Sequence, residues 1–264
     1  MSKRLIGCLS LALCLGLGLF AFFSTRPAKN RVLVYTHNGP LPDGRQGFVH
    51  DNIATCAEAI RQLGEANGFA VDVSDDPAIF ADESLKRYRV LVFDNTNNKT
   101  FDTTDQKAAF QRFIHAGGGF VGIHSASGSE RYWPWYWRLI GGTFKIHAPF
   151  QPFTVKVMDP HHPSTAGYPA ETFPWTDEFY FLDHMPDDLH ILLAGDMTKL
   201  NFPTKAKYRT ELYGDWHPLT WCHEFEGGRA WYTALGHPKS AYADPLFRKL
   251  ILGGILWAMG TGHS

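Results

Sequence analysis

The feature that most constrains the fold is the alternation, in the first half of the chain, between short apolar runs and helical stretches. Arg31–Tyr35, Tyr88–Phe93 and Phe120–Ile123 are apolar runs, whereas His50–Asn67 repeats apolar residues at helical spacing and is followed by Gly68. Near-continuous apolar runs are typical of parallel strands that are buried on both faces, with helices as the crossovers. We therefore predict an α/β protein with a doubly wound, mostly parallel sheet and helices on both of its faces.

The alternation of predicted strands and helices ends at about residue 150, and after it strand-like runs follow one another with few helices between them. Glu226-Gly227-Gly228 is a hairpin signal between the last two runs, and a helix is predicted over 245–259. The pattern predicts one domain over 31–260 with a β-rich C-terminal extension. The predicted strands of this extension are Phe153–Val157, Leu189–Ala194, Leu219–Phe225 and Arg229–Leu235.

Residues 1–30 precede this domain and are predicted to be a targeting segment with a short linker. Lys3 and Arg4 stand before the uncharged run 5–23, which is long enough to cross a membrane and lacks a convincing cleavage site after it. We expect an uncleaved signal anchor that holds an exported, periplasmic or extracellular, domain at the membrane. A cleaved signal peptide, which would give a secreted protein, is the second interpretation, and a buried core helix is the third.

Composition excludes some classes of function. The chain has 264 residues, of which 44% are hydrophobic, and a formal net charge of −1, so nothing in its charge balance favours nucleic acid as a partner. Beyond the targeting segment the only cysteines are Cys56 and Cys222, which we expect to be buried free thiols, with a single disulfide as the alternative. Without a C-x-x-C spacing, metal binding by cysteine is unsupported. The sequence leaves the oligomeric state open.

Four polar side chains lie within two residues of the ends of predicted strands. They are His37, Asn95, His124 and His237. In open α/β sheets, ligands bind at the carboxyl ends of the strands, so four such groups at separate strand ends predict a common site.

The stretch GGGFVGIHSASG, residues 117–128, is typical of a strand–turn–helix elbow. Elbows of this kind present a nucleophile at their tip, but here the tip is His124, and Ser125 stands one residue further on. An elbow that exposes a nucleophile would equally expose an imidazole. Histidine at this position indicates a general acid or base, or a metal ligand.

The elbow and several further motifs resemble those of the ThuA-like proteins of trehalose utilisation, and the resemblance extends over nearly the whole length from Arg31 to Gly260. The resemblance implies a flavodoxin-like fold related to class I glutamine amidotransferases, and a link to disaccharide or keto-sugar metabolism. The related amidotransferases carry cysteine where His124 stands, so glutamine hydrolysis is not expected. The motifs that carry the resemblance are Gly119–Ser125, Trp133–Trp137, Leu139–Gly142 with His147, Asp159–Pro163, Asp177–Tyr180, Pro218–Trp221, Gly228–Tyr232 and Ala234–His237.

The candidate site combines these groups. We predict His124, His37 and His237 as catalytic residues. Asp177 and Glu178 are adjacent, so on a strand they face opposite ways and only one can enter a cleft. Aromatic residues after the elbow either wall a sugar site or brace a loop. The predicted substrate-binding residues are Asn95, Trp133, Tyr136, His147, Asp177 and Glu178.

The predicted function is that of an exported enzyme that isomerises, cleaves by elimination, or hydrolyses a disaccharide or keto-sugar, with His124 as acid/base. A ketone makes such chemistry accessible, because it acidifies the neighbouring C–H bonds. The predicted partner is thus a small-molecule carbohydrate. No cofactor is predicted; a divalent metal is the alternative, although no H-x-x-x-H pair supports it. The competing function is a non-catalytic carbohydrate-binding protein that kept the fold without the nucleophile.

Overall fold

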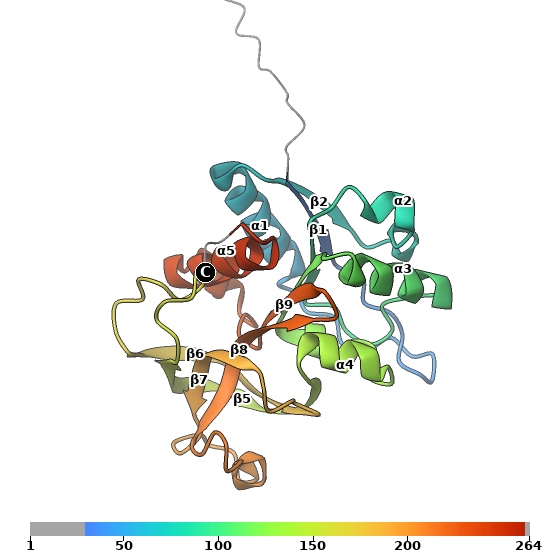
Figure 1. Ribbon diagram of the computed structural model, residues 1–264. Helices are drawn as coiled ribbons and strands as arrows, with labels where there is room; N and C mark the ends of the chain where they lie inside the picture. Colours follow the sequence, from blue (N-terminus) through green and yellow to red (C-terminus); the bar gives the residue numbers. More distant parts are fainter. Residues whose placement is uncertain (1–29, 262–264) are drawn as a thin grey trace, which may run out of the picture.

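The computed structural model describes residues 30–261. Its strands form one nine-stranded sheet of order β2-β1-β3-β4-β9-β8-β7-β5-β6 (Figure 1). The first five strands of this order run parallel. All five side chains of β3 and of β4 are buried, which confirms that these apolar runs are interior strands. The parallel strands are β1 (Arg31–Tyr35), β2 (Ala70–Ser74), β3 (Val90–Asp94), β4 (Gly119–Ile123) and β9 (Gly228–Thr233).

Helices cover both faces of the parallel half, as the sequence predicts. One face is covered by α1 (Ile53–Asn67) and α5 (Pro245–Ala258), and the other by α2 (Asp82–Leu85), α3 (Thr104–His115) and α4 (Pro134–Ile140) (Figure 1). A capping box opens α3: the Thr103 hydroxyl accepts a hydrogen bond from the Gln106 backbone amide, and the Gln106 side chain accepts one from the Thr103 amide. Gly68 closes α1 at a φ of 75°.

The antiparallel half continues the same sheet. Its strands are β5 (Thr143–Val157), β6 (Thr172–Asp183), β7 (His190–Asp196) and β8 (Trp216–Phe225), and β8 joins the parallel half by pairing with β9. The sequence predicts only the last third of β5 and misses β6 as a strand. Two irregularities in the β5–β6 pairing and prolines in both strands weaken the alternation by which strands are recognised.

Many of the aromatic side chains lie in the hydrophobic core. Trp221 and Trp231 are fully buried, and the indole of Trp221 donates a hydrogen bond to the Ile140 carbonyl. Cys56 and Cys222 are buried free thiols, as predicted. The high tryptophan count therefore reflects packing more than ligand binding.

The signal anchor or signal peptide predicted over residues 5–23 lies outside the described residues. Within residues 30–261, no helix is long and apolar enough to cross a membrane.

Candidate functional site

His124 stands directly after β4, at the carboxyl edge of the parallel strands. Its φ of 49° is in the left-handed region, and the chain continues as a 3₁₀ turn over His124–Gly128. The phenol of Tyr232 donates a hydrogen bond of 2.8 Å to the His124 carbonyl, which helps to hold this backbone conformation. The elbow thus lies where the sequence predicts, on the edge that binds ligands in such sheets.

The imidazole of His124 is fully buried, so the prediction of an exposed tip is wrong. Its Nδ1 lies 2.7 Å from the Ala234 carbonyl, which can only accept, so Nδ1 carries the proton. Nε2 is then the free nitrogen, and it lies 2.9 Å from the Tyr180 hydroxyl and 3.5 Å from Glu178 Oε2. Tyr180 and Glu178 both belong to β6, and this strand covers the elbow.

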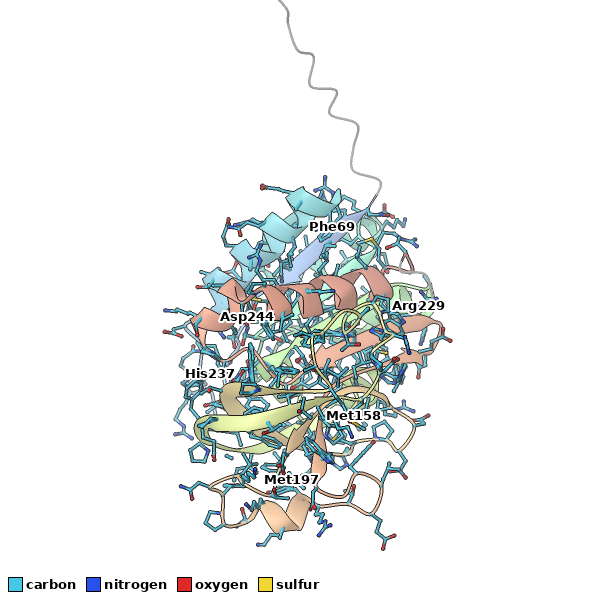
Figure 2. All side chains as sticks on the ribbon, turned by 90° about the vertical axis from the view of Figure 1, so that its left-hand side faces the viewer. Phe69, Met158, Met197, Arg229, His237 and Asp244 are labelled. Atoms are coloured by element: carbon cyan, nitrogen blue, oxygen red, sulfur yellow. The ribbon has the colours of Figure 1, made fainter. Side chains whose placement is uncertain are left out.

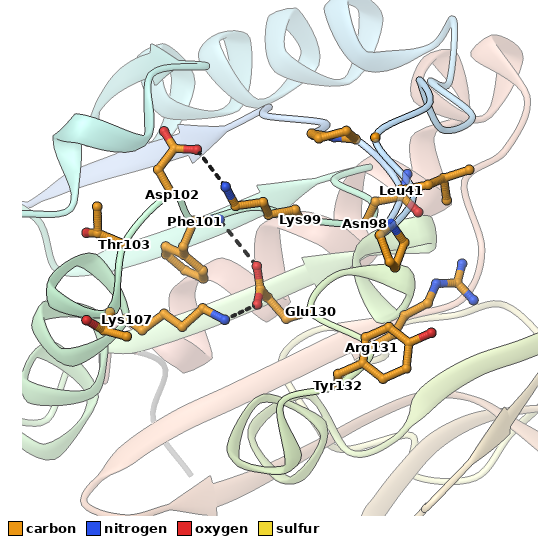
Figure 3. Close-up of a pocket in the computed structure, with 14 residues that line it drawn as sticks. Leu41, Asn98, Lys99, Phe101, Asp102, Thr103, Lys107, Glu130, Arg131 and Tyr132 are labelled. Atoms are coloured by element: carbon orange, nitrogen blue, oxygen red, sulfur yellow. Dashed lines mark hydrogen bonds and ion pairs between the residues drawn. The ribbon is translucent and has the colours of Figure 1, made fainter.

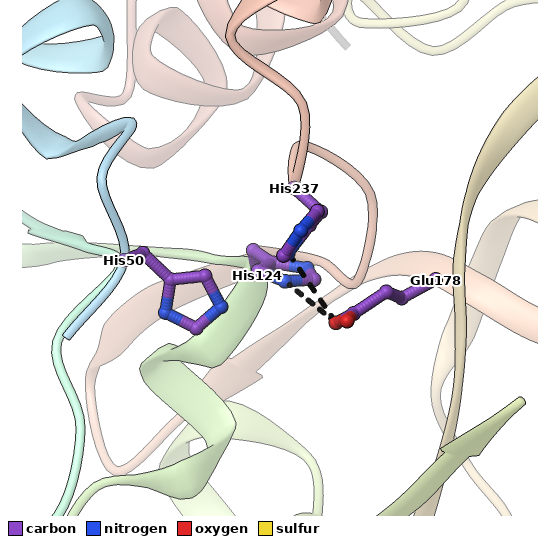
Figure 4. Close-up of side chains that lie close together, drawn as sticks. All are labelled: His50, His124, Glu178 and His237. Atoms are coloured by element: carbon purple, nitrogen blue, oxygen red, sulfur yellow. Dashed lines mark ion pairs between the residues drawn. The ribbon is translucent and has the colours of Figure 1, made fainter. Parts of the chain in front are cut away.

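Figure 4 shows four side chains converging at this point, which we call the His124 cluster: His50, His124, Glu178 and His237. They come from the loop before α1, the end of β4, the middle of β6 and the loop after β9. One potential ligand atom of each lies within 4.8 Å of those of the others. Glu178 is central, because its Oε2 lies 3.4 Å from His237 Nδ1 and its Oε1 lies 3.6 Å from Nδ1 of a fifth residue, His147.

The turn that carries His237 is fixed on both sides by buried polar groups. The Asp177 carboxylate accepts hydrogen bonds from the amides of Gly236 (2.8 Å) and His237 (3.2 Å), and the Asn52 amide group donates to the carbonyls of the same two residues. Gly236 has a φ of 114°, which a residue with a Cβ rarely adopts. Figure 2 shows His237 at the edge of the molecule, between Asp244 at the start of α5 and the strands β5 and β6.

Asp177 and Glu178 have separate roles because they lie on opposite faces of β6. Asp177 is fully buried, and burial raises its pKa above the ordinary value. Burial also acts to raise the pKa of Glu178, but hydrogen bonding to His124 and the nearby imidazoles outweigh it, and this pKa is lowered. Asp177 therefore positions the His237 turn, whereas Glu178 presents a carboxylate to the histidines.

His50 is the member of the cluster that sequence reasoning missed. Its Nδ1 lies 3.1 Å from the Ser125 hydroxyl, and its ring centroid lies 4.9 Å from that of His124 and 5.4 Å from that of His237. Burial, with the neighbouring His124 and His237, lowers its pKa to about 3, so the ring is neutral at physiological pH. The sequence pattern placed His50 inside a helix, but α1 begins only at Ile53.

Six of the nine predicted site residues lie outside the His124 cluster. Two of them support it, because His147 pairs with Glu178 and Asp177 holds the His237 turn. The other four have different surroundings. His37 contacts the Asp75 carbonyl with its Nδ1 and stacks on Tyr35. The Asn95 amide group is buried and donates to Asp94 and Tyr242. Tyr136 is fully buried and donates to the Ala126 carbonyl, while Trp133 packs on Phe101 and Lys107. Tyr136 thus braces the elbow from within the core, and the half-buried Trp133 stacks on Tyr136, which agrees with the bracing alternative that the sequence left open.

A cavity of about 870 Å³ lies apart from the His124 cluster, between the loop around Leu41 and the start of α3 (Figure 3). Glu130 lies in it and pairs with Lys107 while accepting hydrogen bonds from the amides of Thr100 and Phe101. A carboxylate satisfied in this way is typical of a structural ion pair, and no side chain of the cluster lines the cavity.

Two exposed phenylalanines stand beside the cluster. Phe48 is 65% exposed, with its ring centroid 4.7 Å from that of His50, and Phe150 is 51% exposed, 6.0 Å from His237. Exposed aromatic rings next to a polar site can stack on the C–H faces of a ligand.

Fold and site together define an α/β protein of the doubly wound class, with an imidazole–carboxylate site at the carboxyl edge of its parallel strands. The chain belongs to the ThuA family: the model of that family, described as trehalose utilisation, matches residues 31–258. The family connects the chain with carbohydrate metabolism and makes a sugar a plausible ligand.

Solved structures of low sequence identity share the fold. A putative ThuA-like protein from Bacteroides uniformis is 23% identical, with a TM-score of 0.67, and the match covers 91% of this chain and 95% of that one. A second, from Parabacteroides merdae, is 19% identical, with a TM-score of 0.65 and coverages of 87% and 90%. A β-galactosidase from Rahnella sp. R3 matches over 32% of its own length and 89% of this chain, with 14% identity and a TM-score of 0.53. Comparison with curated proteins gives no significant match.

Proposed function

We propose that the protein is an enzyme of carbohydrate metabolism that acts on a disaccharide or a keto-sugar, with the His124 cluster as its reaction centre. The observation that carries this proposal is the position of the Glu178 carboxylate, 3.4 to 3.6 Å from the imidazoles of His124, His147 and His237. Several convergent proton-transfer groups are more than a simple binding cleft needs. The family description supplies the sugar as the substrate class.

The chemistry is simplest for a sugar with a ketone at C3. A base removes a proton from the carbon beside the carbonyl, and the electron pair of that C–H bond moves to the carbonyl oxygen. Return of the proton to a different atom isomerises the sugar, whereas expulsion of the glycosidic oxygen from the next carbon cleaves it by elimination. His124 with Glu178 is the acid/base pair of this proposal, acting through the His124 Nε2 that Ala234 leaves free.

Access to this pair is from the side of His237 and His147, because the His124 ring itself is buried. The side chains of His237 and His147 are 30% and 39% exposed, against 15% for Glu178. A sugar at this entrance would meet the exposed ring of Phe150 beside His237. In this proposal Phe150 and Phe48 contact the sugar, which is one of the two roles that the sequence analysis left open for Trp133 and Tyr136.

The location of this chemistry in the cell follows from the targeting segment. The prediction for residues 5–23 is a signal anchor or signal peptide, and the proposed enzyme would then act outside the cytoplasm.

Deuterium exchange tests the proposal without a guess at the product. The full-length chain is incubated in D₂O with a panel of disaccharides and their 3-keto forms, and proton NMR follows the C–H signals beside the ketone. We expect enzyme-dependent exchange or turnover, and its loss in Glu178→Gln. His115 is exposed, pairs with Glu226 at 2.6 Å and does not belong to the His124 cluster. His115→Ala, which also disrupts a His–Glu pair, is therefore the matched control. Sugar binding without exchange or turnover by any form of the protein would instead identify a binding protein.

A further inference from the structure

The distances within the His124 cluster match those between the ligands of a metal ion. At zinc–ligand bonds of about 2.0–2.1 Å, neighbouring atoms of a tetrahedral site lie about 3.3 Å apart. Glu178 Oε2 lies 3.5 Å from His124 Nε2 and 3.4 Å from His237 Nδ1, and all four potential ligand atoms lie within 4.8 Å of one another. Side-chain shifts of about an ångström would therefore be enough to close a four-ligand site.

The hydrogen bonds around the cluster orient the rings in the way that metal-binding histidines require. His124 donates from Nδ1 to the Ala234 carbonyl, and the Nδ1 of His50 is paired with the Ser125 hydroxyl, so each ring keeps Nε2 for a ligand. The carbonyl partner of His124 fixes the tautomer and the direction of its lone pair, whereas the Ser125 hydroxyl holds the His50 ring in place and can accept its Nδ1 proton. The Tyr180 hydroxyl now shares Nε2 of His124 and would turn away when an ion binds.

His237 supplies an independent indication that the cluster can bind a further group. Its Nδ1 is buried and has no hydrogen-bond partner in the described part of the chain, although Glu178 lies 3.4 Å away. Buried polar atoms without a partner are rare in folded proteins and commonly mark the place of an ion or a water molecule.

We propose that His50, His124, His237 and Glu178 bind one divalent transition-metal ion. Three imidazoles and a carboxylate suit zinc and its neighbours in the first transition series, whereas magnesium and calcium require oxygen ligands. The inference rests on the proposed function only for the role of the ion, which would polarise the ketone oxygen of the sugar. With the ion bound, His124 and Glu178 would serve as ligands instead of as the acid/base pair. His147, which is not among the four ligands, would then be the imidazole that carries the proton.

Metal titration of the chelator-stripped full-length chain tests the inference. Calorimetry with Zn²⁺, with the metal content measured after desalting, should give one ion per chain, and Mg²⁺ should not bind at the same concentration. Glu178→Gln, which keeps the shape of the side chain, and His50→Ala should each weaken Zn²⁺ binding at least about tenfold. His115→Ala should retain the wild-type stoichiometry and affinity, since its lone His–Glu pair offers too few ligands.

The inference is overturned if the stripped wild-type chain binds no Zn²⁺, or if Glu178→Gln in folded form binds it as tightly as wild type. Deuterium exchange into the 3-keto-sugar separates the two proposals. Exchange by a chain that binds no Zn²⁺ would sustain the proposed function and remove the metal. Stoichiometric Zn²⁺ binding without exchange or turnover would sustain the metal site and remove the proposed function.

Discussion

Two of the buried histidine sites within residues 30–261, the His124 cluster and the surroundings of His162, differ in how the ring nitrogens are satisfied. In the second region, His162 accepts a hydrogen bond at Nδ1 from the Ser164 amide and contacts the Ser164 hydroxyl at 2.6 Å, while its Nε2 contacts Cys222 Sγ at 3.6 Å. In the His124 cluster, by contrast, three rings face one carboxylate, and His237 Nδ1 has no hydrogen-bond partner among the described residues.

The difference teaches that burial of histidine is not in itself a sign of function. His162 obtains its Nδ1 partners two residues further along the chain, and burial, with the nearby His190, lowers its pKa to about 4. It is a neutral packing group at physiological pH. The members of the His124 cluster come from four distant segments, and the fold brings them together without satisfying them fully.

The largest effect that would separate the two regions is the loss of activity in His124→Ala. We expect kcat on a 3-keto-sugar to fall by roughly 10²–10⁴, the usual contribution of a proton-transfer group. His124→Gln should be nearly as poor, since an amide does not exchange a proton near neutral pH. Because the ring is buried, both variants should also lose about 1–3 kcal/mol of stability, measured by denaturant unfolding.

His162→Ala is the control for this prediction, because it removes an equally buried ring from the other region. It should lose a comparable amount of stability and keep its kcat within about a factor of two of wild type once the comparison is restricted to folded protein. Equal losses of kcat in the two variants would erase the distinction between the regions.

A second effect concerns Asp94, which lies behind the His124 cluster and shares a hydrogen bond with Asn95. Burial raises the pKa of Asp94 to about 7, against the lowering effect of the hydrogen bond from Asn95. The unfolded chain ionises at its ordinary, lower pKa, so the free energy of unfolding should fall as pH rises from about 4 to 7. The contribution of Asp94 lowers the free energy of unfolding by at most about 1.4 kcal/mol per pH unit, and above about pH 7 it no longer changes with pH.

Asp94→Asn should remove this part of the pH dependence and be the more stable protein at pH 8. The measurement is denaturant unfolding of both proteins at a series of pH values. If the two proteins instead show the same dependence of unfolding free energy on pH, Asp94 has an ordinary pKa and its burial does not destabilise the ionised carboxylate.

A smaller effect is expected from the thiols. Cys222 contacts His162, and Cys56 lies in α1; neither belongs to the His124 cluster. The double variant Cys56→Ala with Cys222→Ala should keep its turnover and lose about 1–3 kcal/mol of stability through packing. Loss of turnover in a variant with a native circular dichroism spectrum would revive a thiol mechanism.

The smallest effect should follow deletion of residues 1–29. Within the described residues, β1 pairs with β2 and β3 from Arg31 onward, and we expect the sheet to form without residues 1–29. The shortened chain should unfold cooperatively, with a free energy within about 0.5 kcal/mol of the full-length value. If the truncated chain cannot be obtained in folded form, the predicted boundary of the domain is wrong.

The inner strands β1, β3 and β4 are predictable because they are buried on both faces and therefore appear in the sequence as nearly uninterrupted apolar runs. β6 is not, because its first half alternates between exposed and half-buried residues and includes Pro174. β5 carries an exposed segment around Lys145 and Phe150, which the sequence pattern does not distinguish from a loop.

The candidate site is predictable to the extent that it follows strand ends. His124 and His237 stand directly after β4 and close after β9, whereas Glu178 could be placed only as one of two adjacent carboxylates. His50 was hidden by an error of three residues in the start of α1. The signal that would have found it is its place in the first loop after β1, which opens on the same edge of the sheet as the other strand ends.

The alternation of Asp177 and Glu178 along β6 limits how the protein can change its length. An insertion or deletion of one residue ahead of this pair, with the strand pairing kept, would turn the Asp177 side chain toward the histidines and leave the His237 turn without its acceptor. A change of two residues would keep the faces but move both side chains about 7 Å along the strand, away from the His237 turn and the histidines. The part of β6 ahead of Asp177 is therefore fixed in length, and changes in chain length are better tolerated in the loop between β5 and β6.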